Sequence, residues 1–213
     1  MNYKFNSTMY AVALAGGMLF SACSGNKQEG QDHQKEADEM TEMKADKPAE
    51  VSSSEVKVFE NVDPLVKTQI NGFLTEYFAL NKSLIEDNND EAKAAAKRLS
   101  ATVSKFDMSK LTGEQMSFYH TQLAKLNAGL KGINESGDIE ETRMELAPVS
   151  ESIYALVKAY QSNSSELYYQ FCPMAKNGEG ANWLSSTQEI VNPYMGQRML
   201  KCGKTQEVIA QIR

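Results

Sequence analysis

The sequence predicts an all-α protein, an up-down four-helix bundle with a loop-rich C-terminal segment that closes over one end. Three observations predict this fold. Between residues 63 and 160, apolar side chains recur at spacings of three and four in four separate segments, which is the period of a helix with one buried face. Short connections that contain Asn, Ser and Gly join these segments, and short connections favour antiparallel neighbours. After Ser165 the helical period ends, and Cys, Pro, Gly and Trp become frequent.

The helices are expected to begin where capping residues precede the apolar pattern. Asp63 and Pro64 are residue types favoured at the start of a helix, and Thr112 and Gln115 have the spacing of a capping box. Pro148 should kink the fourth helix, because proline cannot donate a backbone hydrogen bond. The expected helices run over residues 64–87, 90–106, 112–133 and 138–160.

Residues 1–22 are typical of a signal peptide. One lysine precedes an apolar run over residues 9–20, which is long enough for a signal-peptide core and too short to span a bilayer. Two small residues then precede Cys23, as in a bacterial lipoprotein cleavage box with Cys23 as the lipidated residue. An ordinary secretory signal with a chance cysteine is the alternative. The mature chain is expected to face the periplasm and to be attached to a membrane of the cell envelope through its lipid only. The expected membrane is the outer one.

Residues 23–57 are expected to form a polar tether ahead of one domain over residues 58–213. Residues 24–57 include nine acidic residues and five lysines but no aromatic residue and no regular apolar period, so they lack the side chains that build a core. In this tether His33, Met40 and Met43 could bind copper(I) weakly, because thioether sulfur is a soft ligand. The alternative is a polar spacer with two incidental methionines.

The C-terminal segment, residues 166–213, holds the residue types that suggest a function. Cys172 and Met174 are two positions apart, and Met199 and Cys202 are three apart. If the segment doubles back, two thiolates and two thioethers converge, and such soft ligands select copper(I) over zinc or magnesium. The alternative is a disulfide between the two cysteines, which would pin a helical protein-interaction module that binds no metal.

Two further residues are candidate ligands. His120 is expected on the third helix, beside its apolar stripe, either as a partly exposed structural residue or as a ligand if the C-terminal segment folds over that helix. Met195 lies within residues 194–200, which are expected to form a short helix. Residues 167–171 are expected to be extended.

Composition and motifs argue against two classes of function. The formal net charge of −6 disfavours a nucleic-acid-binding protein, which needs a basic face to neutralise phosphates. An enzyme is not expected either. The chain has two histidines and lacks the motifs for haem attachment, a phosphate-binding loop or a zinc protease. It offers no plausible nucleophile–base pair.

Three stretches of the C-terminal segment carry a resemblance to a bacterial family. They are residues 169–175 (YQFCPMA), 180–185 (GANWLS) and 189–203 (EIVNPYMGQRMLKCG). They resemble the periplasmic domain-of-unknown-function family 3347, which joins such a tail to a helical region, so the resemblance extends over the whole folded part. This family occurs as free-standing lipoproteins and fused to adaptor subunits of heavy-metal efflux pumps. The resemblance therefore implies the handling of copper or a related metal in the periplasm, with an efflux adaptor as partner.

The chain departs from the patterns it resembles at several positions. Its Cys-Pro-Met sequence is similar to the start of a short heavy-metal-binding motif, but Ala175 stands where that motif has histidine. Met195 occupies a position that is more often aromatic in the family. Members also tend to have histidines in the region where this chain has Gly132, Glu141 and Glu145. These departures argue against a histidine site between helices and leave the cysteine and methionine set intact.

Overall fold

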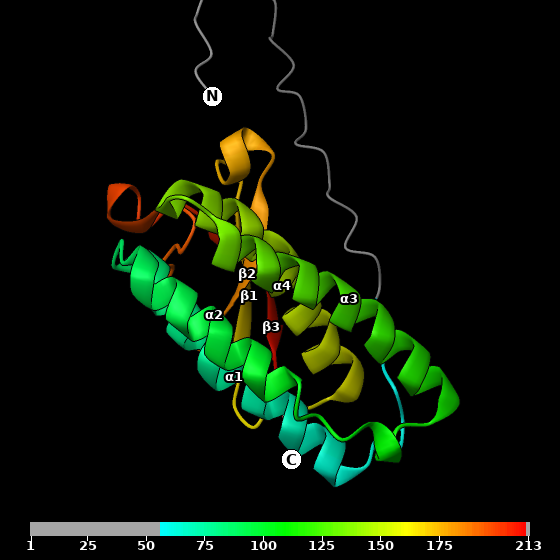
Figure 1. The fold of residues 1–213 in the computed structure, drawn as a ribbon. Helices are drawn as coiled ribbons and strands as arrows, with labels where there is room; N and C mark the ends of the chain where they lie inside the picture. The colour runs from blue at the N-terminus through cyan, green and yellow to red at the C-terminus, as the bar shows by residue number, and fades with distance from the viewer. Residues whose placement is uncertain (1–55, 212–213) are drawn as a thin grey trace, which may run out of the picture. The chain divides into compact units, whose positions relative to one another are not determined.

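The computed structural model describes residues 56–211 (Figure 1). The signal peptide, the lipidation site Cys23 and the tether residues His33, Met40 and Met43 lie outside these residues, so what the sequence predicts for them stays a prediction. None of the helices in the described part has the length and apolar character that crossing a bilayer requires.

Four helices follow one another along the described chain: α1 (Pro64–Ile85), α2 (Asn89–Val103), α3 (Gly113–Glu135) and α4 (Ile139–Tyr160). The predicted caps are formed. The Asp63 carboxylate accepts a hydrogen bond from the backbone N–H of Leu65 at 2.8 Å, and the backbone N–H of Thr112 donates to Gln115 Oε1 at 3.1 Å. These bonds satisfy backbone groups that have no partner inside the helix.

The helices form the predicted bundle around one core. α1 packs along α2 and α3 packs along α4, and the two pairs pack on each other (Figure 1). On α1 the fully buried residues include Val66, Ile70, Phe73 and Tyr77, at the spacing of three and four that predicted the helix. α4 contains Pro148 and remains helical to Tyr160.

The prediction of a purely α-helical fold is wrong, because the C-terminal segment forms a sheet. Its strands are β1 (Leu167–Cys172), β2 (Ala181–Ser185) and β3 (Lys204–Ile209), in the order β2-β1-β3 with antiparallel neighbours. Of these, only β1 coincides with a stretch that was expected to be extended. The expected short helix over residues 194–200 is a single 3₁₀ turn, Gly196–Arg198.

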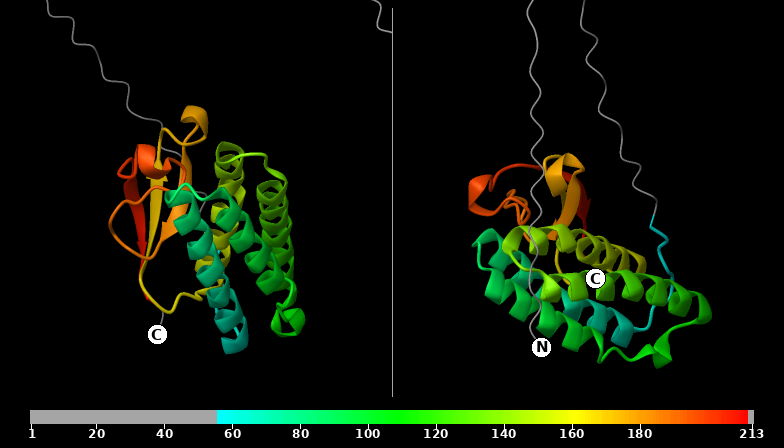
Figure 2. Two further views of the ribbon diagram at one scale, coloured as in Figure 1. Left: turned by 60° about the vertical axis from the view of Figure 1, so that its left-hand side comes forward. Right: turned by 45° about the horizontal axis from the view of Figure 1, so that its top comes forward.

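The sheet lies beside α1 and α4 rather than closing over one end of the bundle (Figure 2). The Tyr77 hydroxyl on α1 accepts a hydrogen bond from the backbone N–H of Leu184 on β2 at 3.0 Å. The rings of Tyr154 on α4 and Tyr169 on β1 stack with 3.8 Å between their centroids. The fold is therefore a helical bundle with a small antiparallel sheet on one side.

Candidate functional site

The two cysteines of the C-terminal segment meet because their strands pair. Cys172 is the last residue of β1, and Cys202 lies two residues before β3, the strand that is hydrogen-bonded to β1. In the register of this pair, Phe171 faces Lys204, so the chain continues with Cys172 opposite Gly203 and Cys202 one residue further on. Their Sγ atoms are 2.8 Å apart, and both residues are free cysteines. Cys172 is fully buried, whereas Cys202 is half-buried.

The distance between the sulfur atoms lies between two chemical states. A disulfide has a sulfur–sulfur bond of about 2.05 Å. Two sulfurs that share a tetrahedral ion at about 2.3 Å are about 3.8 Å apart. With Sγ atoms at 2.8 Å, the pair must open by about 1 Å to accept an ion, or close by a similar amount to form a disulfide.

Burial raises the pKa of Cys202 to about 11, and the neighbouring Cys172 thiol acts in the same direction. The backbone N–H of Met174 hydrogen-bonds to the Cys202 sulfur and acts in the opposite direction, because it favours the thiolate. At neutral pH the Cys202 side chain is therefore a protonated thiol, and a metal ion must displace its proton to bind.

Cys202 is expected to react slowly with iodoacetamide in the reduced protein. At pH 8 a thiol with a pKa near 11 is present as thiolate about 100-fold less often than a thiol with a pKa of 9. Its thiolate is more nucleophilic, which raises the reaction rate again by about tenfold. We expect a rate about tenfold below that of a cysteine peptide, still rising with pH above pH 9. Peptide mapping after timed alkylation measures the rate at which Cys202 reacts. A rate that reaches its plateau by pH 9 would contradict the raised pKa.

The two methionines nearest the cysteines in sequence have exposed side chains. Met174 is 51% exposed and Met199 is 38% exposed. Met199 is held close to the thiols, since its carbonyl accepts a hydrogen bond from the backbone N–H of Cys202 at 3.1 Å. Both methionine side chains are therefore accessible from solvent.

A buried asparagine organises the loop that carries the other ligand candidates. Asn192 is fully buried, and its Nδ2 donates to the Cys202 carbonyl at 2.7 Å. Its Oδ1 accepts from the backbone N–H groups of Tyr194 and Met195, at 2.8 and 3.2 Å. The sequence does not mark this residue as functional, because an asparagine before a proline is typical of an ordinary turn.

Arg143 on α4 joins this loop to the helices. Its side chain is only 4% exposed. It donates to the Pro193 carbonyl at 3.2 Å and to the Leu84 carbonyl at 2.8 Å, and it pairs with Asp87 and Glu140. Its buried guanidinium therefore holds the end of α1, the start of α4 and the loop together.

Met195 is half-buried and lines a pocket of about 200 Å³ at the start of α4. Met174 lines the same pocket, together with Met144, which sequence analysis did not propose. His120 is exposed on α3, a helix that packs against α2 and α4. The structure thus brings Cys172 to Cys202 and Met174 to Met195, and it joins Met199 to Cys202 through the backbone. His120 lies outside these groups.

Within residues 56–211, no group of three or more His, Cys, Asp or Glu side chains is placed to hold a metal ion. Thiolates bind zinc as well as copper(I), whereas thioethers favour copper(I) and suit neither zinc nor magnesium.

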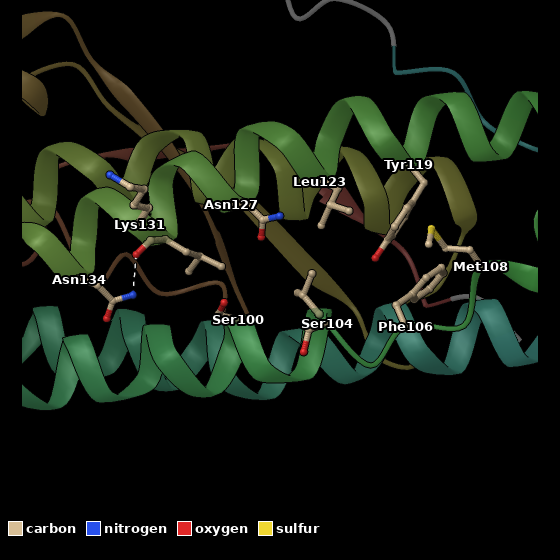
Figure 3. Close-up of a pocket in the computed structure, with 11 residues that line it drawn as sticks. Ser100, Ser104, Phe106, Met108, Tyr119, Leu123, Asn127, Lys131 and Asn134 are labelled. Carbon is tan, nitrogen blue, oxygen red and sulfur yellow. Dashed lines mark hydrogen bonds between the residues drawn. The ribbon is translucent and has the colours of Figure 1, made fainter.

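A larger pocket, of about 420 Å³, lies between α2 and α3 (Figure 3). Phe106, Met108 and Tyr119 line one end, and Ser100 and Asn134 line the other. No cysteine borders it, and Met108 is its one methionine. It is therefore separate from the sulfur-containing region.

The comparisons with known proteins give one match. The sequence model of a family described as "Protein of unknown function (DUF3347)" matches residues 73–165. These residues span most of the helical bundle and end before β1, so the C-terminal motifs lie outside the match. No curated protein and no solved structure matches the chain.

Proposed function

The chain belongs to the DUF3347 family through its helical part, and we propose that its C-terminal segment binds a soft metal ion, copper(I). The observation that supports this most is the meeting of two free thiols, those of Cys172 and Cys202, in a segment that also has two exposed methionines. The ion would replace the thiol protons, and the sulfurs would separate to make room for it. Met174 and Met199 would complete its coordination.

The residue chemistry supports copper(I) rather than a harder ion. Thiolate and thioether sulfur are soft ligands, which copper(I) prefers. The thioethers of Met174 and Met199 are exposed, so an arriving ion can reach them without unfolding the core. Cys202 is half-buried, and it follows a turn, so its sulfur can move further than that of a residue within a strand.

We also propose where this activity takes place. The signal-peptide pattern and Cys23 support a lipoprotein that is anchored in the cell envelope and faces the periplasm. We expect the anchor to lie in the outer membrane. There the protein would sequester the metal or pass it to a heavy-metal efflux adaptor and so support metal tolerance. His33, Met40 and Met43 of the tether could serve as a loading arm.

Copper(I) titration of the reduced intact chain against a competing chelator, bicinchoninate, tests the proposal. We expect one tightly bound ion per chain. Cys172→Ser should weaken binding by about 100-fold or more, and Met199→Leu by about tenfold, because each removes one soft ligand. Met108→Leu is the matched control, since Met108 is exposed but lies in the other pocket. Unchanged affinity in both Cys172→Ser and Met199→Leu would end the proposal.

A second candidate function is a disulfide-pinned protein-interaction module without metal. The observation that favours it is the 2.8 Å between the sulfurs, which is shorter than two sulfurs on a shared ion require. N-ethylmaleimide labelling of the protein taken from the cell envelope separates the two candidates. Labelling of Cys172 and Cys202 only after reduction supports the disulfide, whereas labelling before reduction supports free thiols that can bind metal.

A further inference from the structure

The pocket between α2 and α3 contains a buried hydroxyl group without a hydrogen-bond partner. The side chain of Tyr119 is 1% exposed, and within residues 56–211 no group forms a hydrogen bond with its hydroxyl. Figure 3 shows this side chain reaching from α3 into the space between the two helices, with the hydroxyl at its far end. A buried hydroxyl without a partner costs stability, so a bound molecule that pairs with it would recover that cost.

The Tyr119 hydroxyl is protonated at neutral pH and is available as a donor. Burial raises the pKa of Tyr119 well above its ordinary value, because the phenolate would lose its hydration. A ligand therefore has to offer an acceptor. In the described part of the chain, Tyr119 is the one residue of the lining that is both buried and polar, so the ligand needs no buried donor in return. A carbonyl oxygen meets this requirement.

The lining around Tyr119 suits an aromatic ring. Phe106, Met108 and Leu123 lie at this end of the pocket, and the rings of Phe106 and Tyr119 stack with 4.2 Å between their centroids. Aromatic rings and thioether sulfur attract a further ring in addition to burying its apolar area. Met108 is 36% exposed, and its flexible side chain can move aside to admit a molecule to the buried hydroxyl.

The Tyr119 end of the pocket favours an uncharged ligand. Lys131 is the one charged residue of the lining in the described part. It lies twelve positions further along α3, which is about 18 Å along the helix axis, and it already pairs with Glu135 at 2.6 Å. An ion beside Tyr119 would therefore lose its hydration without gaining a partner.

We infer that this pocket binds a small uncharged aromatic carbonyl compound, whose carbonyl oxygen accepts a hydrogen bond from Tyr119 and whose rings pack against Phe106 and Met108. The pocket volume of about 420 Å³ lies within the range of small-molecule sites, about 300–1,000 Å³. The inference goes beyond the proposed metal binding, because it rests on a different pocket and on different residues.

Binding of benzophenone and of diphenylmethane to the intact chain tests the inference. The two molecules have the same rings, but only benzophenone has a carbonyl group. In protein with ¹³C-labelled methionine methyl groups, benzophenone should shift the signal of Met108 and leave the signals of Met144, Met174 and Met195 in place. The shift should saturate at one molecule per chain, and Met108→Leu assigns the signal.

Tyr119→Phe should weaken benzophenone binding by about tenfold and leave the affinity for diphenylmethane unchanged, since only the carbonyl group uses the hydroxyl. The variant should fold, because the hydroxyl has no hydrogen bond to lose within residues 56–211. Tyr160→Phe is the matched control. Its hydroxyl donates to the Gln115 carbonyl at 2.5 Å and Tyr160 does not line the pocket, so this variant should bind benzophenone as the wild type does.

Two results would overturn the inference. One is a Met108 signal that stays in place up to the solubility limit of benzophenone. The other is a benzophenone affinity that Tyr119→Phe leaves unchanged, because the pocket would then hold rings without using the hydroxyl, as when a water molecule already occupies its hydrogen bond. Neither result bears on the copper(I) titration, which reports on the thiols.

Discussion

Replacing Arg143 with methionine is expected to lower the free energy of unfolding by about 2–4 kcal/mol. The guanidinium is almost fully buried and donates to the carbonyls of Leu84 and Pro193 as well as to two carboxylates. Methionine replaces its volume but none of its hydrogen bonds, so the carbonyls lose their donors in a buried place. Because Asp87 and Glu140 are partly exposed, water can solvate them, which keeps the loss below that of a fully buried ion pair. Urea unfolding followed by circular dichroism measures the change.

Arg98→Met is the matched control for this prediction. Arg98 also pairs with two carboxylates, those of Glu76 and Glu91, at 2.8 and 3.0 Å, but its side chain is 45% exposed. Exposed ion pairs contribute little to stability, so the control should cost less than about 1 kcal/mol. Equal losses in the two variants would show that the buried position of Arg143 does not matter.

Gly196→Ala is expected to destabilise the protein by about 2–4 kcal/mol. Gly196 has a φ of +54°, and a Cβ there would overlap Arg143 Nη2 and Asp87 Oδ1. The added methyl group must push apart the ion pair of Arg143 and Asp87 or displace the loop. Because the loop also carries Met195 and Met199, we expect metal affinity to fall together with stability. Thermal unfolding and the copper(I) titration measure the two effects.

Gly178→Ala separates the steric effect from the backbone effect. Gly178 also has a positive φ, of +95°, but a Cβ there meets nothing within 4 Å. Its substitution should cost only the backbone strain, about 1 kcal/mol. If Gly178→Ala proves as damaging as Gly196→Ala, then strain rather than the contact with Arg143 accounts for both.

The helical part of the fold could be predicted because its causes are local. The apolar spacing within each helix, and the caps at Asp63 and Thr112, are set by residues within a few positions of one another. The sheet could not be predicted in the same way. β3 takes its hydrogen bonds from β1, more than thirty residues earlier, and a register shift at Tyr169 and Gln170 interrupts the regular pairing.

The candidate site, like the fold, has residues that the sequence could identify and residues that it could not. The soft character of Cys172, Met174, Met199 and Cys202 follows from their side chains, so the sequence suffices to propose them. The sequence could not identify Met144 as a candidate, because a methionine within an amphipathic helix such as α4 is an ordinary residue. Arg143 reads as part of a solvated helix face, yet the structure buries it, since the loop after β2 folds over it.

By itself, then, the sequence determined the four helices, their order and the chemical type of the candidate ligands. Only the tertiary structure decided that the C-terminal segment is a sheet, that it lies beside α1 and α4, and which sulfur atoms meet. The physical reason is the range of the interactions. Helix hydrogen bonds join residues four apart, whereas the pairing of β1 with β3 brings Cys172 and Cys202 together across thirty residues.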